Sequence, residues 1–259
     1  STPMQAMFRL YRSLIRMMSK GEISPSIRAF IFKNRSFSSP KSLTKSLPVP
    51  QGKQVMQTFS KPAQALAHSC NVYYGELAAK VGRDALQRTC DKLGLNGTLS
   101  CDGYKARSTV DLSQADEGSV AWAGIGQYTD LVNPARFLTF LGAVANDGVE
   151  VTPHVVEKIA LGDQTTYSAS AGTTTRRLSK ALAKTLQEGM RGNVENNYGV
   201  SSFPEGMTVC AKTGTAQGED GSRPNAMIAG FVLDDEYPLA FFAAVEHGGY
   251  GADVCVPLM

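Results

Sequence analysis

The hexapeptide Lys212-Thr213-Gly214-Thr215-Ala216-Gln217, near the C-terminal end of the 259-residue chain, is the main guide to the fold. It lies at the end of a short run at 207–212 that is expected to be a strand. Two more runs rich in β-branched, small and aromatic residues come after it, at 226–233 and 239–246, with turn-forming clusters between them. Short runs of this composition between turn clusters indicate strands. The C-terminal third therefore predicts a three-stranded antiparallel meander.

Helical patterns fill the sequence before that meander. Asn133-Pro134 places a preferred N-cap residue and a first-turn proline at a helix start, and Asp147-Gly148 marks its end. Further helices are expected over 4–20, over 63–93 in two or three pieces broken near 68–71, and over 175–190. Helices followed by a sheet, without strict alternation, favour an α+β fold: an antiparallel sheet flanked by helices, with a helical subdomain.

The residue types in the hexapeptide suit an edge that receives a substrate. Lys212 supplies a fixed positive charge, the hydroxyls of Thr213 and Thr215 can bind a carboxylate, and Gly214 lets another backbone approach closely. A Lys-Thr-Gly tripeptide alone is also compatible with an ordinary turn at a strand end. The extended hexapeptide, placed just ahead of two more strands, favours the substrate-binding interpretation.

A second candidate motif is Ser69-Cys70-Asn71, between two expected helices. A serine and an asparagine two positions apart in such a loop can project into one cleft. The common role of this pattern is helix capping. The two motifs together point to a catalytic cleft more strongly than either does alone.

At these residues the sequence resembles the transpeptidase domain of penicillin-binding proteins, the serine acyl-transferase fold shared with β-lactamases. The resemblance covers about residues 62–256. It extends to several further segments: 65–74 around Ser69, 124–127, 133–135, 145–148, 225–231 and 244–249. It implies a β-lactamase/transpeptidase-like architecture and acyl transfer to a serine.

The resemblance also implies a role for each motif residue. Ser69 would relay a proton to the leaving amine, and Asn71 would hold the base and the substrate amide. Lys212 would keep the local field positive, while Thr213 and Thr215 would bind the substrate carboxylate beside Gly214. The backbone N–H of Thr215 would be one of two oxyanion donors. The expected ligands are D-Ala-D-Ala stem peptides of peptidoglycan and β-lactams, with no cofactor and no metal.

The family's nucleophile motif, Ser-x-x-Lys on a helix, is not found in register. Laying the pattern on the first expected helix puts Ala6 at the serine position and Arg9 at the lysine position. Alanine cannot be acylated, and arginine keeps its proton. The tetrads Ser38–Lys41 and Ser42–Lys45 lie among prolines that oppose a helix, so Ser42 and Lys45 are weak candidates.

Three interpretations of this mismatch remain open. Residues 1–61 are an altered or out-of-frame version of the family's segment, or the chain is a non-catalytic protein that binds cell-wall peptides, or Ser42 and Lys45 act in an unusual geometry. A β-lactam sensor or a β-lactamase-like domain is a further alternative for the fold.

Charge divides the chain at the same place. Residues 1–61 carry eleven Lys/Arg and one acid, a net +10, while residues 62–259 total −7. We therefore expect an atypical basic segment at 1–61 and a transpeptidase-like body at 62–259, in a single domain truncated at both ends. A basic arm can also bind nucleic acid, but no recognition module accompanies it, so no nucleic-acid partner is expected.

The remaining features set expectations for pairing and location. Five cysteines show no metal-ligand spacing, and one bridge, Cys90 to Cys101, is conceivable. No run of eighteen apolar residues spans a membrane. The family implies work on the extracytoplasmic face of the bacterial membrane, with an anchor outside this chain.

Overall fold

The computed structural model describes residues 62–169, 172–216 and 222–259. The expected helix at 4–20 and the residues Ala6, Arg9, Ser42 and Lys45 lie outside this part. The described helices are α3 (Pro62–Ala67), α4 (Asn71–Val81), α5 (Arg83–Lys92), α6 (Glu117–Ala123), α7 (Pro134–Ala145), α8 (Lys180–Asn193) and α9 (Gly251–Cys255), with shorter turns η1 (Val194–Tyr198), η2 (Val200–Ser202) and η4 (Val256–Leu258). The strands are β1 (Gly97–Cys101), β2 (Tyr104–Ser108), β3 (Val149–Val151), β4 (Lys158–Leu161), β5 (Gln164–Ser168), β6 (Thr174–Arg176), β7 (Val209–Ala216), β8 (Asn225–Val232) and β9 (Ala240–Val245).

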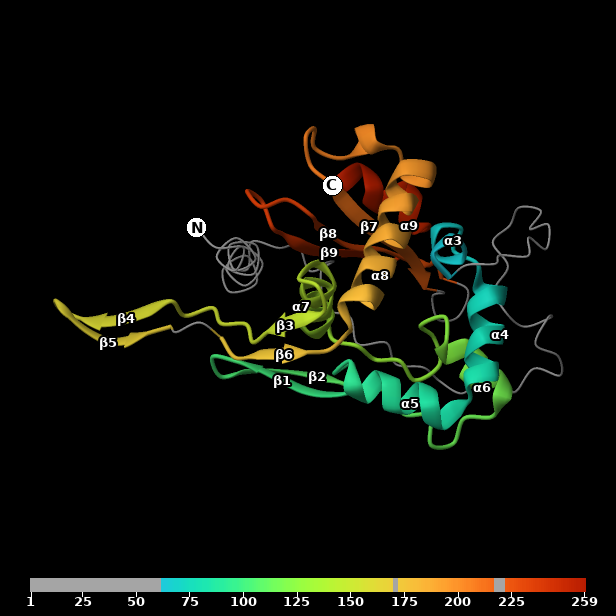
Figure 1. Ribbon diagram of the computed structural model, residues 1–259, viewed down its shortest axis with the longest axis horizontal. Helices are drawn as coiled ribbons and strands as arrows, with labels where there is room; N and C mark the ends of the chain where they lie inside the picture. The colour runs from blue at the N-terminus through green and yellow to red at the C-terminus, as the bar shows by residue number, and fades with distance from the viewer. Residues whose placement is uncertain (1–61, 170–171, 217–221) are drawn as a thin grey trace.

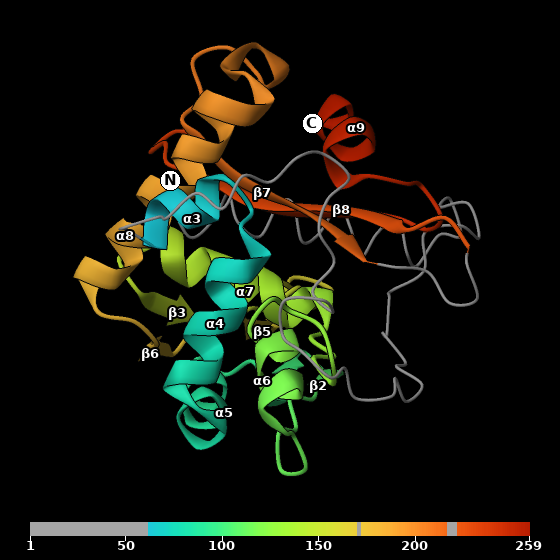
Figure 2. The same cartoon turned by 90° about the vertical axis from the view of Figure 1, so that its right-hand side faces the viewer.

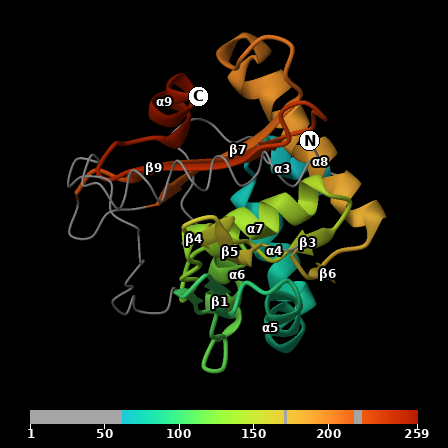
Figure 3. The same cartoon turned by 90° about the vertical axis from the view of Figure 1, so that its left-hand side faces the viewer.

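The expected meander is confirmed as a three-stranded antiparallel sheet in the order β7-β8-β9. Helix α9 covers one face of this sheet, and α7 and α8 cover the other (Figures 1 and 3). Side chains of β7 alternate between the two faces: Cys210 belongs to the core beneath α7 and α8, whereas Val209 and Ala211 belong to the core beneath α9. The α+β fold class is therefore confirmed.

A smaller helical subdomain lies away from the sheet. Figure 2 shows α4, α5 and α6 together on the side opposite to α9. Its core is a separate apolar cluster of Ala78, Val110, Leu112, Ala115, Val120 and Ala123. None of the described helices is long and apolar enough to span a lipid bilayer.

Two expectations need correction. The helix expected over 175–190 begins only at Lys180, because residues Thr174–Arg176 form strand β6 against β3 and Ser179 caps the helix by accepting from the N–H of Leu182. Cys90 and Cys101 are both free thiols, so the conceivable bridge between them is absent.

Candidate active site

The outer edge of β7 carries the Lys212–Thr215 motif, and side chains from α8 and η1 cover the first half of this edge. Antiparallel pairing with β8 turns the peptide groups of alternate residues outward. The outward carbonyl of Val209 accepts from Arg191 at 3.3 Å, and that of Ala211 accepts from Asn193 at 3.2 Å. Farther along, the N–H of Thr213 donates to the hydroxyl of Tyr198 at 2.8 Å.

Lys212 makes the last hydrogen bond to the covered half of the edge. Its ammonium group donates to the outward carbonyl of Thr213 at 2.7 Å. Burial lowers the pKa of Lys212 to about 8, so the side chain is still mainly a cation at neutral pH. The N–H of Thr215 is the next outward donor on this strand. The outward backbone groups are thus capped as far as Thr213, and the next outward N–H, that of Thr215, is the one expected to be an oxyanion donor.

Thr215 is exposed, and the C-terminal segment orients it. Its hydroxyl oxygen accepts from the N–H of Gly251 at 3.0 Å, which leaves the hydroxyl proton available for another acceptor. Gly251 lies so near the strand that a Cβ there would be 2.3 Å from the carbonyl oxygen of Gly214. This contact at Gly251 was not predicted from the sequence.

Ser69 lies in the turn between α3 and α4, in a left-handed conformation with φ of +50°. Its N–H donates to the carbonyl of Leu66, and the N–H of Cys70 donates to that of Ala65, at 3.1 and 3.0 Å. This is the Schellman pattern that ends a helix, with Ser69 where glycine is usual. Cys70 then caps α4 through its sulfur, which accepts from Tyr73 N–H at 3.4 Å, and Asn71 is the first residue of α4.

Two asparagines connect the Ser69 turn to β7. The side-chain N–H of Asn197 donates to the carbonyl of Ala67, at the end of α3, and also to the side chain of Asn193 at 2.8 Å. Asn193 is fully buried and in turn donates to Ala211, the residue before Lys212. The junction of α8 and η1 is therefore hydrogen-bonded to a residue shortly before each motif, Ala67 and Ala211. Figures 1 and 2 show α3 beside α8.

Sequence reasoning missed the residues that contact the two motif-bearing segments: Asn193, Asn197 and Tyr198. The available signal was polar: asparagines at 193, 196 and 197 follow a helix whose earlier face is leucine-rich. Asn197 and Tyr198 lie in the π-helical turn η1, a feature frequently found at functional sites. Among the described residues, no group of three or more His, Cys, Asp or Glu side chains is arranged to hold a metal ion.

Comparison with known proteins gives a family match. The family model of the penicillin-binding protein transpeptidase domain matches residues 29–258. That match begins after Ala6 and Arg9 and before Ser42 and Lys45.

Individual relatives cover most of the chain. The peptidoglycan D,D-transpeptidase PbpA of Mycolicibacterium smegmatis is 27% identical over 190 residues, which is 72% of this chain and 38% of that protein. Penicillin-binding protein A from M. tuberculosis, solved as a ceftriaxone acyl-enzyme complex, superposes with a TM-score of 0.68 at 24% identity, covering 77% of this chain and 48% of that one.

A third likeness comes from another organism. The D,D-transpeptidase domain of a peptidoglycan glycosyltransferase from Eggerthella lenta gives a TM-score of 0.64 at 25% identity, covering 75% of this chain and 50% of that one. The chain spans well under two thirds of the length of these relatives. With the family model matched over most of its length, the chain belongs to the family of penicillin-binding protein transpeptidase domains.

Proposed function

We propose that this chain is a peptidoglycan D,D-transpeptidase domain that recognises D-Ala-D-Ala stem peptides and β-lactams outside the cytoplasmic membrane. The supporting observation is the edge of β7, where α8 and η1 cap the backbone as far as Thr213 and Thr215 follows exposed. A bound peptide would lie along the uncapped part, as an added strand does at an open sheet edge.

In this proposal each motif residue acts on a defined part of the substrate. The Thr213 and Thr215 hydroxyls donate to the terminal carboxylate, and the Thr215 N–H stabilises the oxyanion that forms when a serine attacks the penultimate carbonyl. Ser69 passes the proton to the departing D-alanine, and Asn71 holds the substrate amide. Lys212 adds positive charge, and water screens its attraction to the substrate less because the group is buried.

The second candidate is a domain that binds the same peptides without acylation. It is favoured by the absence of any Ser-x-x-Lys tetrad from residues 62–169, 172–216 and 222–259. Ser42 and Lys45 remain the candidate nucleophile pair within the stretch matched by the family model. If Ala6 and Arg9 instead occupy the serine and lysine positions of the motif, the chain is non-catalytic.

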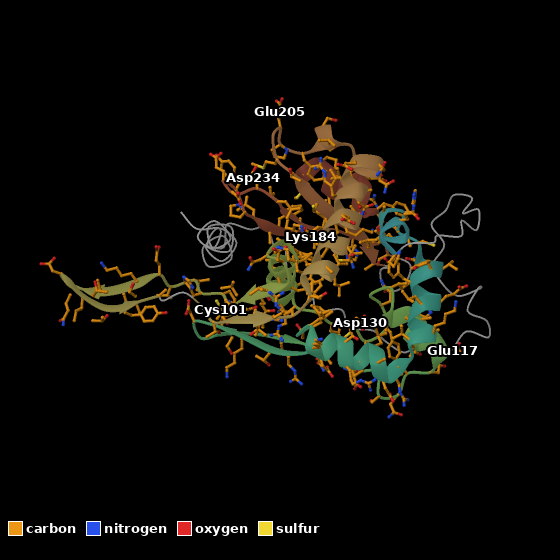
Figure 4. The ribbon with its side chains drawn as sticks, viewed as in Figure 1. Cys101, Glu117, Asp130, Lys184, Glu205 and Asp234 are labelled. Carbon is orange, nitrogen blue, oxygen red and sulfur yellow. The ribbon has the colours of Figure 1, made fainter. Side chains whose placement is uncertain are left out.

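Labelling with a fluorescent penicillin, followed by peptide mass spectrometry, separates these candidates. Acylation predicts an adduct on one serine, and Lys212→Ala should slow its formation by at least about tenfold because a buried cation is lost. Lys184→Ala is the matched control, because Lys184 is exposed on α8 (Figure 4). This variant should be labelled at the wild-type rate. No adduct, with retained binding of a D-Ala-D-Ala peptide, would support the non-catalytic candidate. Loss of both would contradict the proposal.

A further inference from the structure

Tyr198 is the last residue of the π-helical turn η1, and its hydroxyl makes two contacts with a single residue of β7. It lies 2.8 Å from the backbone nitrogen of Thr213 and 2.8 Å from the Thr213 hydroxyl oxygen. The Tyr198 ring packs against the apolar cluster beneath α9, and this packing fixes its position. Thr213 lies on the same face of the sheet.

The direction of these hydrogen bonds follows from the chemistry of the groups. The Thr213 N–H can only donate, so it occupies a lone pair of the phenolic oxygen. The second contact joins the two hydroxyl oxygens, and its geometry allows either one to be the donor. A phenol is a better donor and a poorer acceptor than an aliphatic alcohol, because its oxygen lone pair is delocalised into the ring. Tyr198 therefore donates to Thr213.

This arrangement leaves one proton unused, that of the Thr213 hydroxyl. Burial raises the pKa of Tyr198 above its ordinary value, so the phenol keeps its proton through the neutral range. With its oxygen already accepting from Tyr198, the Thr213 hydroxyl can direct its own proton only toward a further acceptor. A carboxylate suits that donor well, since hydrogen bonds to charged groups are the stronger ones.

We propose that Tyr198 is a positioning residue that holds the Thr213 hydroxyl as an obligate donor and thereby sets the selectivity of the site for a terminal carboxylate. The inference rests on the proposed function, in which Thr213 meets that carboxylate. Tyr198 itself does not touch the substrate. It acts by fixing the orientation of the neighbouring hydroxyl and the outward N–H of the same residue.

The test measures carboxylate selectivity by equilibrium binding, so it does not depend on acylation. Dissociation constants are measured by NMR titration for an N-acetylated peptide ending in D-Ala-D-Ala and for the same peptide as its terminal carboxamide. The wild-type chain should bind the acid more tightly, by about tenfold or more. Tyr198→Phe keeps the ring but should lose most of this preference, while binding of the carboxamide changes little.

Tyr104→Phe is the matched control. Tyr104 is an exposed tyrosine at the start of β2, and its variant should keep the full preference for the acid. A general loss of structure would weaken both peptides equally, so the ratio of the two dissociation constants separates positioning from stability. If Tyr198→Phe retains the wild-type ratio, the inference is wrong. If the wild type itself shows no preference, the carboxylate assignment in the proposed function fails, and the inference fails with it.

A measurement on the unaltered chain covers the case in which Tyr198→Phe does not fold. Tyrosine labelled with ¹³C at the ζ position reports hydroxyl exchange, because protonated and deuterated hydroxyls give separate signals in mixed water when exchange is slow. A phenol that donates to Thr213 from its buried position should give two signals for Tyr198. A single averaged signal would overturn the donor assignment.

Discussion

At the scale of single residues, Ser69 occupies a backbone position that suits glycine. The left-handed conformation costs an L-residue about 1 to 2 kcal/mol, and glycine avoids this cost. Part of that advantage is offset because glycine gives the unfolded chain more conformational entropy. We therefore expect Ser69→Gly to be more stable than Ser69→Ala by about 1 kcal/mol in urea unfolding. Both variants lack the hydroxyl and should lose penicillin labelling alike. Equal stability of the two would show that the turn does not keep this conformation.

Asp130 is the second residue whose surroundings predict a measurable effect. It lies in the loop between α6 and α7, and its Oδ1 is buried without a hydrogen-bond partner among the described residues. Figure 4 shows it in the half of the molecule that contains α5 and α6. Burial raises the pKa of this carboxyl to about 7. The folded chain therefore holds a proton that the unfolded chain releases near pH 4.

Stability should accordingly fall as the pH rises from about 4 to about 7, and Asp130→Asn should remove this loss. Between pH 5 and pH 8 the wild type should lose about 2 to 3 kcal/mol of unfolding free energy that Asp130→Asn retains. Asp235→Asn, at an exposed aspartate in the turn between β8 and β9, is the matched control. An identical pH dependence in wild type and Asp130→Asn would refute the assignment.

At the scale of elements, the sequence predicted those helices and strands whose bounds are set by residues close to them in the chain. The Asn133-Pro134 start of α7 is confirmed, since the Asn133 side chain accepts from the N–H of Ala135. The three strands of the main sheet are also confirmed, because each is an apolar run between turns. Strands β3 and β6 were not predicted: each has three residues, and they pair across more than twenty intervening positions.

The same limit explains which parts of the site were predicted. Lys212–Thr215 and Ser69–Asn71 carry recognisable motifs, so the sequence is enough to select them. Asn193 and Tyr198 adjoin the Lys212–Thr215 motif only through their hydrogen bonds to Ala211 and Thr213 of β7. That contact depends on how α8 crosses the sheet edge, which no local pattern contains.

The hairpin of β4 and β5 contributes no buried residue to the core. Every residue of both strands is exposed, and the hairpin projects away from the body in Figure 1. Joining Lys158 to Ser168 through Gly-Gly should change the unfolding free energy by less than about 0.5 kcal/mol. By contrast, Leu99→Ala in β1, where the leucine is buried, should cost about 2 to 5 kcal/mol. Similar losses in both variants would mean that the hairpin packs against the body.

At the scale of the whole molecule, one buried ionic cluster joins the helical subdomain to the elements beside the sheet. Arg136 of α7 pairs with Glu150 of β3 through two hydrogen bonds of 2.9 and 2.6 Å, and Arg177 reaches the same carboxylate at 3.1 Å. The two guanidinium groups also donate to backbone carbonyls at the end of α5, from Lys92 to Gly94. Cations at a helix C-terminus are favourable there, and Glu150 balances their charge.

Removing that balance should destabilise the whole chain. Glu150→Gln leaves two guanidinium groups without their carboxylate, and because Arg136 and Glu150 are only 4% and 5% exposed, we expect a loss of about 3 to 5 kcal/mol. Glu195→Gln breaks an exposed pair with Arg191 and should cost less than about 1 kcal/mol.

The pH dependence gives a second signature of this cluster. Burial alone would raise the pKa of Glu150, but the hydrogen bonds and charges of Arg136 and Arg177 outweigh it and lower the pKa. The stabilisation is therefore present above the ordinary glutamate pKa and is lost as the pH falls through the lowered value. Because Asp130 acts in the opposite direction at higher pH, unfolding free energy measured across pH should peak at mildly acidic pH. Glu150→Gln should flatten only the acid side, and an unchanged acid side in that variant would contradict the role of the cluster.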